Sequence, residues 1–222
     1  KRLTVQSTGI GPDNIDIVFN ELDALVNVDL NTKEIKPNHT ALNIVRIGTS
    51  GSLQADIPVD SWVMSKYAIG LDNMLRSYLI EEHSVAELED AFIAQTNWDL
   101  RKGRPTVVPC AEALENKIYS DKFHKGFTGT AGGCYGPQGR VVRLNIQDPQ
   151  LNSKMDAFNF NGTRMTNLEM ETSAIYGLGK LLGHNCLSLN AIIANRAVGE
   201  FSSKPEETVN ELIAYTLDKL IK

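Results

Sequence analysis

An arginine close to a glycine-rich segment could bind a phosphate group. Arg46 is followed by Gly48, Thr49, Ser50 and Gly51, a segment dense in backbone amides and hydroxyl groups. Glycines let an anion approach backbone N–H groups, and a guanidinium offers a bidentate fork to phosphate oxygens. The same residues are also compatible with a tight turn beside a surface arginine. The residue types therefore suggest an anion site, and the pattern alone leaves the plain turn open.

A second cluster, from Gly132 to Arg140, contains too many residues that interrupt helices and strands to form a regular element. We expect a shaped loop. Gln138 carries an acceptor and two donors and Arg140 carries only donors, so the pair could bind the edge of a planar imide. Tyr135 could stack on the ring of such a ligand. The alternative is a turn whose polar side chains face water.

A third cluster places two carboxylates, Glu169 and Glu171, just before an apolar helical pattern. Carboxylates only accept hydrogen bonds, so they could hold paired sugar hydroxyls, strengthened by a facing arginine such as Arg46. The other explanation is helix-start chemistry. Acidic residues favour the positive end of a helix, and Thr166 or Asn167 could supply the cap.

Other classes of site and partner are disfavoured by spacing and composition. The histidines are scattered, without a His-Glu-x-x-His or paired Cys-x-x-Cys pattern, so we predict no metal site. The net charge of −5 argues against nucleic-acid binding, and no apolar run approaches the roughly 20 residues that cross a membrane. An odd count of 3 cysteines at wide spacing favours reduced thiols and a cytoplasmic location.

Strand-like and helix-like patterns alternate along the chain, which predicts a single α/β domain over residues 1–222 with a central mixed sheet flanked by helices. Leu3 to Ser7 alternates like a strand, and apolar residues from Ile15 to Val26 follow at helical spacing. The expected strands further on are Asn43 to Ile47, with a loop over Gly48 to Ser52, then Ser61 to Tyr67, Lys125 to Thr130 and Cys186 to Ala194. Helices are expected over Val85 to Ala94, from Met170 to Leu181, and at the end of the chain, where Ser203 and Glu206 form a possible capping box and Pro205 suits the first turn.

In this order and at these separations, the three clusters resemble those of the nucleoside phosphorylase family, whose members cleave nucleosides with inorganic phosphate. The resemblance covers nearly the whole chain and implies a three-layer α/β/α fold. It implies phosphate binding by Arg46, Gly48 and Thr49, ribose binding by Ser50, Glu169, Met170 and Glu171, and base binding by Gly51, Tyr135, Gln138, Arg140, Ile193 and Ala194.

Within that family the base loop is similar to the uridine phosphorylase type. Pro137 stands where a glycine usually precedes the glutamine, and Cys134 replaces a common aromatic residue. Asn195 occupies the place of the aspartate with which purine-specific bacterial members protonate the base. The resemblance implies phosphorolysis of uridine, and of deoxyuridine or thymidine as further substrates, to uracil or its analogue and the sugar 1-phosphate. The alternatives are a purine nucleoside or methylthioadenosine phosphorylase or hydrolase, and an inactive nucleoside-binding homologue.

The same resemblance implies the chemistry and the assembly. Arg140, Gln138, Arg46 and Glu171 are the expected catalytic residues, inorganic phosphate is the co-substrate, and no cofactor or metal is expected. A homodimer or hexamer is implied. Family members begin with a further stretch that carries a phosphate-site arginine, so we expect an N-terminal segment to be lacking from this sequence, which opens on Lys1 without a Met.

Overall fold

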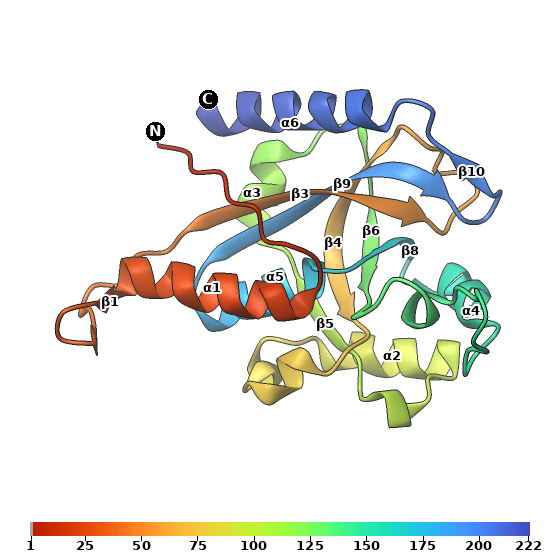
Figure 1. Cartoon of the computed structure of the whole chain (residues 1–222), viewed down its shortest axis with the longest axis horizontal. Helices are drawn as coiled ribbons and strands as arrows, with labels where there is room; N and C mark the ends of the chain where they lie inside the picture. The colour runs from red at the N-terminus through yellow and green to blue at the C-terminus, as the bar shows by residue number, and fades with distance from the viewer. Residues whose placement is uncertain (1) are drawn as a thin grey trace.

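The computed structural model describes residues 2–222, and most of its strands form one mixed sheet covered by helices (Figure 1). The first residue, Lys1, lies outside the described part. The helices are α1 Pro12–Asn27, α2 Ala86–Thr96, α3 Glu112–Ile118, α4 Leu151–Ala157, α5 Thr172–Leu181 and α6 Pro205–Ile221. The strands are β1 Val28–Asp29, β2 Glu34–Ile35, β3 Asn43–Ser52, β4 Trp62–Gly70, β5 Thr106–Pro109, β6 Phe123–Thr130, β7 Asn159–Phe160, β8 Thr163–Glu169, β9 Asn185–Asn195 and β10 Glu200–Phe201.

The strand order is β10-β9-β3-β8-β6-β4-β5, and β9 also pairs with β4. That extra pairing joins residues Trp62 to Met64 of β4 with Leu189 to Ala191 of β9, in antiparallel orientation. The strands β9, β3, β8, β6 and β4 therefore close into a ring. The pairs β3–β9, β4–β6 and β6–β8 are parallel, whereas β3–β8 and β4–β9 are antiparallel, so the ring is mixed.

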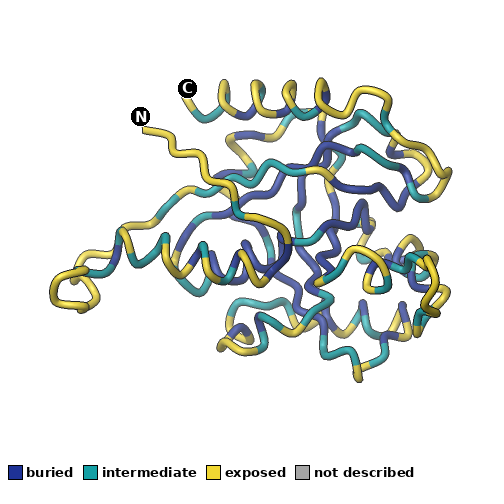
Figure 2. The backbone as a smooth tube through the Cα atoms, viewed as in Figure 1, coloured by how far each residue is buried: buried dark blue, intermediate teal, exposed yellow. Residues whose placement is uncertain are grey.

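Helices cover the sheet from opposite sides, and a core lies on each (Figure 1). One core joins α1, α3, α5 and α6 to the sheet and includes Phe19, Tyr176 and Leu212. The other joins α2 and α4 to the sheet through Phe92, Phe127 and Phe158. Burial is deepest along the strands, while the outer helix faces and the β1–β2 hairpin are exposed (Figure 2). The predicted α/β fold with a central mixed sheet is thus confirmed.

Most expected elements are present, but the strand over Leu3 to Ser7 is wrong. Residues 2–9 form no strand and are mainly exposed, because no neighbouring strand of the described chain pairs with them. The loop expected over Gly48 to Ser52 is also wrong. These residues continue β3, since each of them pairs with β9. Among the described residues, no helix is both long and apolar enough to span a membrane.

The helix caps also differ from the expectation. Pro205 does open α6, but the N-cap residue is Lys204 and no side chain caps the helix there, so the capping box at Ser203 is wrong. Ser202 Oγ instead accepts from the backbone N–H of Lys204 at 3.0 Å, which fixes the entry to the helix one residue later than the pattern suggested.

His184 fastens the turn between α5 and β9 to the start of β3. Its Nδ1 accepts the backbone N–H of Leu42 at 3.2 Å, and its Nε2 lies 3.3 Å from Asp23 Oδ1 on α1. The ring of His39 stacks on that of His184, with centroids 5.8 Å apart, and His39 Nε2 is 2.9 Å from Leu182 O. Three elements thus meet at one buried imidazole.

Burial lowers the pKa of His184 below its usual value of 6.5, and the neighbouring His39 acts in the same direction while Asp23 opposes it. The fold therefore favours the neutral ring, and the unfolded chain binds the proton more readily. Because the folded pKa is depressed, the stabilisation is complete above pH 6.5 and is lost as the pH falls through the folded pKa.

We expect the His184→Gln substitution to lower the free energy of unfolding most at about pH 8 and progressively less toward about pH 5. Urea unfolding at a series of pH values measures the difference between the wild type and the variant. A difference that stays constant across this range would show that the protonation of His184 is not linked to folding.

Candidate active site

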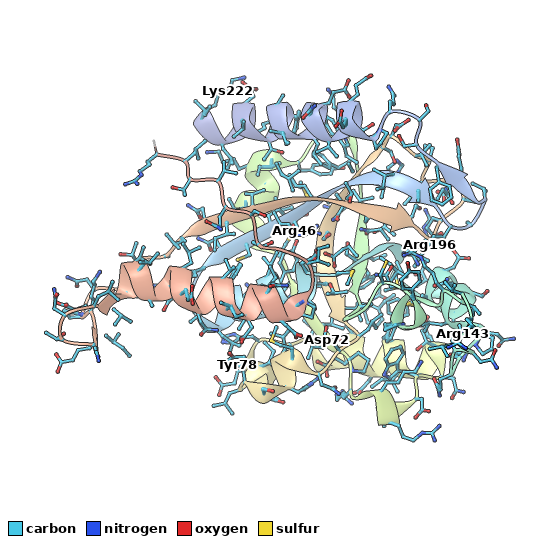
Figure 3. All side chains as sticks on the ribbon, in the orientation of Figure 1. Arg46, Asp72, Tyr78, Arg143, Arg196 and Lys222 are labelled. Carbon is cyan, nitrogen blue, oxygen red and sulfur yellow. The ribbon has the colours of Figure 1, made fainter. Side chains whose placement is uncertain are left out.

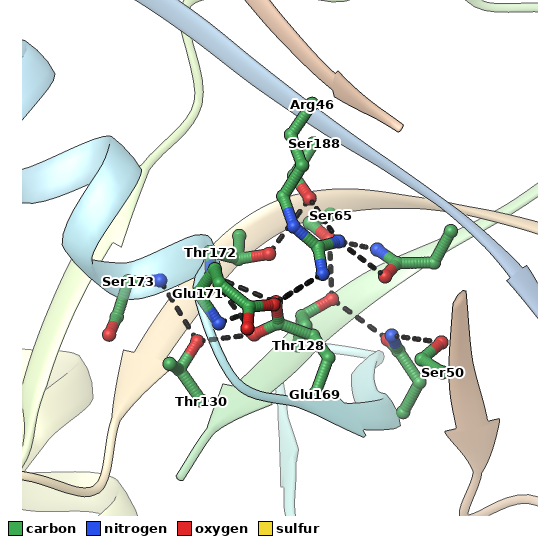
Figure 4. A network of polar contacts seen from close by, with 12 residues as sticks. Arg46, Ser50, Ser65, Thr128, Thr130, Glu169, Glu171, Thr172, Ser173 and Ser188 are labelled. Carbon is green, nitrogen blue, oxygen red and sulfur yellow. Dashed lines mark hydrogen bonds and ion pairs between the residues drawn. The ribbon is translucent and has the colours of Figure 1, made fainter. Parts of the chain in front are cut away.

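Arg46 and two carboxylates form a buried ionic cluster (Figure 4). Arg46 Nη2 lies 2.6 Å from Glu171 Oε2 and 3.2 Å from Glu169 Oε2. Arg46 Nη1 donates to Asn190 Oδ1 at 2.9 Å. Both carboxylates are largely buried, with only 1% and 10% of the Glu169 and Glu171 side chains exposed. The expectation that Arg46 faces a carboxylate of the third cluster is confirmed by this geometry.

Gly48 makes room for the guanidinium of Arg46. The two residues lie on the same face of β3, and a Cβ atom at position 48 would be only 2.4 Å from Arg46 Nη1. A side chain at position 48 would therefore force the guanidinium away from its acceptors. Gly48 was predicted to let an anion approach the backbone. In the structure its missing side chain leaves space for the guanidinium of Arg46.

Glu169 is the last residue of β8 and caps the following helix. Its carboxylate accepts the backbone N–H of Glu171 at 2.8 Å and that of Thr172 at 2.9 Å, and it accepts the hydroxyl of Thr130 at 2.5 Å. Thr166 and Asn167, considered as caps from the sequence, lie instead within β8. Helix-start chemistry and ionic contact with Arg46 therefore coexist in one carboxylate.

Glu171 joins the cluster to the glycine turn before α1. Its Oε1 accepts the backbone N–H of Gly11 at 2.8 Å while its Oε2 accepts from Arg46. Segments 160 residues apart in the chain thus meet at this carboxylate. Met170, between the two glutamates, is partly buried.

The predicted base loop is held by Arg196, an arginine that was not among the predicted site residues. Gln138 is buried, and its side-chain Oε1 and backbone O both accept from the guanidinium of Arg196, the latter at 3.1 Å. Arg140 lies near Arg196 and donates through Nη1 to the backbone O and the Sγ of Cys134, both at 2.9 Å. Burial, and then the charge of Arg140, lowers the pKa of Arg196 to about 10.

Arg196 connects the base loop with β3. Its backbone N–H donates to Ser52 O at 2.9 Å, and its Nε would be 2.8 Å from a Cβ atom at Gly51. Arg46 lies near the middle of the molecule and Arg196 toward the β10 hairpin (Figure 3). The sequence does contain one signal for Arg196. This arginine closely follows a predicted buried strand, and ligands commonly bind beyond the ends of such strands.

The remaining predicted residues divide between the sheet edge and the surface. Ser50 is buried at 6% exposure, while Thr49 is exposed. Ile193 and Ala194 are partly buried near the end of β9, and Ala194 is the register partner of Gly51. These positions lie on β3, which carries Arg46, and on β9, which Arg196 directly follows.

Tyr135 is different, because 62% of its surface is exposed. It lines a cavity of about 760 Å³ beside the base loop, together with Trp98, Arg140 and residues of the segment 142–148. The cavity borders the base loop but includes neither Arg46 nor its carboxylates. The structure therefore does not place Tyr135 against the ionic cluster.

One group of metal-ligating side chains exists within residues 2–222, at Asp23, His39 and His184. The sequence spacing did not suggest it. His184 Nδ1 accepts the N–H of Leu42, so the neutral ring carries its proton on Nε2 and has no lone pair to offer toward Asp23. The group is suited to the polar contact described above and not to holding a metal ion.

Comparisons with known proteins agree on the family. The sequence profile described as "Phosphorylase superfamily" matches residues 1–222. The chain is 26% identical over 212 residues to a uridine phosphorylase from Thermococcus kodakarensis, covering 92% of this chain and 62% of the length of that relative. It is also 26% identical over 224 residues to a DeoD-type purine nucleoside phosphorylase from Bacillus thuringiensis, covering 100% of this chain and 77% of the relative.

Solved structures are similar as well. A Trypanosoma brucei nucleoside phosphorylase described as showing uridine phosphorylase activity superposes with a TM-score of 0.84 at 26% identity, covering 97% of this chain and 78% of that one. A uridine phosphorylase from the oomycete Phytophthora capsici has a TM-score of 0.61 at 20% identity, covering 97% and 73% of the two chains, and supports the fold alone.

We expect Arg46→Met to lower the free energy of unfolding by about 3 kcal/mol, because two buried carboxylates lose their cation. Urea unfolding measures this loss. Lys222→Met is a suitable control, since it breaks an exposed pair with Asp218 that contributes little. Equal effects of the two substitutions would contradict the assignment of Arg46 as the counter-charge of the cluster.

Proposed function

This chain belongs to the phosphorylase superfamily, and from that premise we propose that it cleaves uridine with inorganic phosphate to give uracil and ribose 1-phosphate. The observation that carries the choice of base is the donor-rich base loop. Arg196 binds the buried Gln138 and lies near enough to Arg140 for that charge to lower its pKa, so the base loop brings two cations together. Such a site suits a base that leaves with negative charge.

Asn195 supports a pyrimidine over a purine. Its Nδ2 donates to Gln54 O and Ile57 O, and its Oδ1 accepts the backbone N–H groups of Ala197 and Val198. All four contacts are structural, and an amide cannot donate an acidic proton. The position at which purine-specific relatives are expected to protonate the base is therefore occupied by a residue that holds the backbone.

For the phosphate and the sugar, we assign the residues that surround the ionic cluster. Phosphate binds to Arg46 and to the strand segment of Gly48 and Thr49. The sugar hydroxyls bind to Glu169, Glu171, Ser50 and the backbone of Met170. Gly51, Tyr135, Ile193 and Ala194 complete the base site with Gln138 and Arg140. The ion pair that joins Arg46 to Glu171 supports this arrangement, because it sets the phosphate and sugar groups side by side.

The proposed reaction is a displacement at C1′ of the ribose. A phosphate oxygen forms a bond to C1′ as the C1′–N1 bond breaks, and the bond's electron pair goes to uracil. The sugar passes through an oxocarbenium-like state that the negative phosphate stabilises, while the carboxylates fix its hydroxyls. Arg140 stabilises the charge that develops on uracil, with the permanently protonated guanidinium aimed at a carbonyl oxygen. Uracil then takes a proton from phosphate or solvent.

A second candidate is phosphorolysis of a purine nucleoside, because the DeoD-type purine relative matches at the same identity as the uridine relative. Methylthioadenosine belongs to the same alternative. We further propose that the protein acts in pyrimidine nucleoside salvage in the cytoplasm, and that it assembles as a homodimer or hexamer, which light scattering would test.

Release of free base from uridine, thymidine and inosine, with and without phosphate, tests the proposal. We expect uridine cleavage that depends on phosphate and exceeds the cleavage of inosine. Preference for inosine would favour the purine alternative. Release without phosphate would indicate a hydrolase, and the absence of any release would indicate a nucleoside-binding homologue.

We expect Arg140→Ala to lower the turnover of uridine by about 10²-fold or more, the scale of losing one preorganised donor at a developing charge. Steady-state kinetics measures it. Arg101→Ala is a control, because the Arg101 side chain is 85% exposed and does not line the cavity beside the base loop, so turnover should stay unchanged. Unchanged turnover in Arg140→Ala would remove Arg140 from the mechanism.

A further inference from the structure

Five buried polar side chains form a continuous row next to the ionic cluster, and each comes from a different strand of the closed ring (Figure 4). They are Ser50 of β3, Ser65 of β4, Thr128 of β6, Asn167 of β8 and Asn190 of β9. Ser50 is 6% exposed and the other four are fully buried. A polar row in a closed interior is stable only if its hydrogen bonds are made.

The row is hydrogen-bonded from end to end. Asn190 Nδ2 is 3.3 Å from Ser65 Oγ, and Ser65 Oγ is 2.5 Å from Thr128 Oγ1. Thr128 Oγ1 is 2.8 Å from Asn167 Oδ1, and Asn167 Nδ2 is 2.9 Å from Ser50 Oγ. Arg46 Nη1 begins the row by its contact with Asn190 Oδ1.

Arg46 decides the direction of every bond in the row. A guanidinium only donates, so Asn190 must turn its Oδ1 toward Arg46 and its Nδ2 toward Ser65. Ser65 Oγ therefore accepts from Asn190 and donates its own proton to Thr128 Oγ1. Thr128 Oγ1 in turn donates its proton to Asn167 Oδ1.

The last bond has the same direction. Because Asn167 receives at Oδ1, it donates from Nδ2 to Ser50. Thr166 Oγ1 lies 2.8 Å from the same Oδ1 and 2.9 Å from Phe127 O, and its single proton is shared between these two acceptors. The reverse arrangement would leave the proton of Ser65 facing the N–H group of Asn190, which has no lone pair to accept it. Ser50 thus receives a hydrogen bond from inside the row and keeps its own proton for a partner outside.

We propose that this one-directional row makes Ser50 an obligate hydrogen-bond donor to an acceptor oxygen of the bound sugar, and that Asn190 is the positioning residue that sets the direction. The sugar as the recipient rests on the proposed function, whereas the direction of the row does not. Bonds in such a row polarise one another, and a donor fixed in advance needs no reorientation when the ligand binds. Arg46 and Ser50 both lie on β3, so the row links them around the ring through β9, β4, β6 and β8.

Neutron diffraction from the deuterated, unliganded protein tests the direction itself. We expect the deuterium of Ser65 to point to Thr128, that of Thr128 to point to Asn167, and that of Ser50 to point away from Asn167. A deuterium of Ser50 that points to Asn167, or one of Thr128 that points to Ser65, would overturn the proposal whatever reaction the protein catalyses.

Asn190→Asp tests the consequence, because a carboxylate still accepts from Arg46 but can only accept from Ser65. Every later bond should then reverse, and the proton of Ser50 should be drawn to Asn167. We expect uridine to bind about 10-fold more weakly, the loss that accompanies one hydrogen bond, and we expect the same loss for Ser50→Ala. Titration calorimetry in the absence of phosphate separates this loss from any effect on the phosphate site.

The double variant Ser50→Ala with Asn190→Asp is decisive, since both changes act through one hydroxyl. We expect it to bind about 10-fold more weakly and not about 100-fold. Additive losses, or unchanged binding in Asn190→Asp, would refute the role of the row. A wild type that binds no uridine would refute the proposed function, and the neutron structure would then decide the direction.

Thr128→Val and Thr128→Ser form a matched pair in case Asn190→Asp fails to fold. Valine removes the middle hydroxyl at nearly the same volume, and serine restores it, so only valine should weaken uridine binding. Thr216→Val, a buried threonine of α6 whose hydroxyl donates to Leu212 O, is the control for a general loss of stability. Equal uridine binding by the Thr128 pair would contradict the proposal.

Discussion

The guanidinium of Arg46 is held between two buried carboxylates on one side and a buried amide on the other. Glu169 and Glu171 pair with Nη2, and Asn190 Oδ1 accepts a hydrogen bond from Nη1. The cation and its acceptors therefore satisfy one another away from bulk water. Removing carboxylates from water is costly unless they are paired and hydrogen-bonded. Glu169 gains further donors from the start of α5, and Glu171 gains one from Gly11. The positions of α1, α5 and β8 are therefore tied to that of one arginine.

The closure of the sheet determines what lies beside this cluster. Because β9 pairs with both β3 and β4, polar side chains of neighbouring strands meet in the interior instead of facing water. An interior of this kind is stable only when its donors and acceptors match, and a single donor-only group at one end is enough to order all of them. Arg46 is that group, and it acts at once as counter-charge and as the origin of the polar row.

The sequence allowed the general architecture and part of the site to be predicted. Apolar spacing located α1 and α6, and the complementary charges suggested that Arg46 faces a carboxylate of the third cluster. It did not reveal Asn190, Arg196 or the meeting of His39 with His184. Each of these depends on the pairing of segments far apart in the chain, as with the 58 residues that separate Gln138 from Arg196. Local patterns carry no information on such pairings.

The composition of the segment from Gly48 to Gly51 predicted a loop, which is wrong, although it correctly drew attention to the residues beside the ionic cluster. Glycine and hydroxyl residues are typical of turns, yet in this chain they pair along β9 as a strand. Gly48 lies beneath the guanidinium of Arg46, and Gly51 lies beneath Nε of Arg196.

A shift of register between Ser50 and Gly51 places one extra residue, Ile193, on β9, and Arg196 N–H then reaches Ser52 O. Such irregularities re-aim side chains near functional sites. The two glycines, three positions apart in β3, thus make room for two arginines, one on β3 itself and one directly after β9. One arginine is directed to the carboxylates and the other to the base loop, so the spacing of these glycines sets the distance between the two halves of the site.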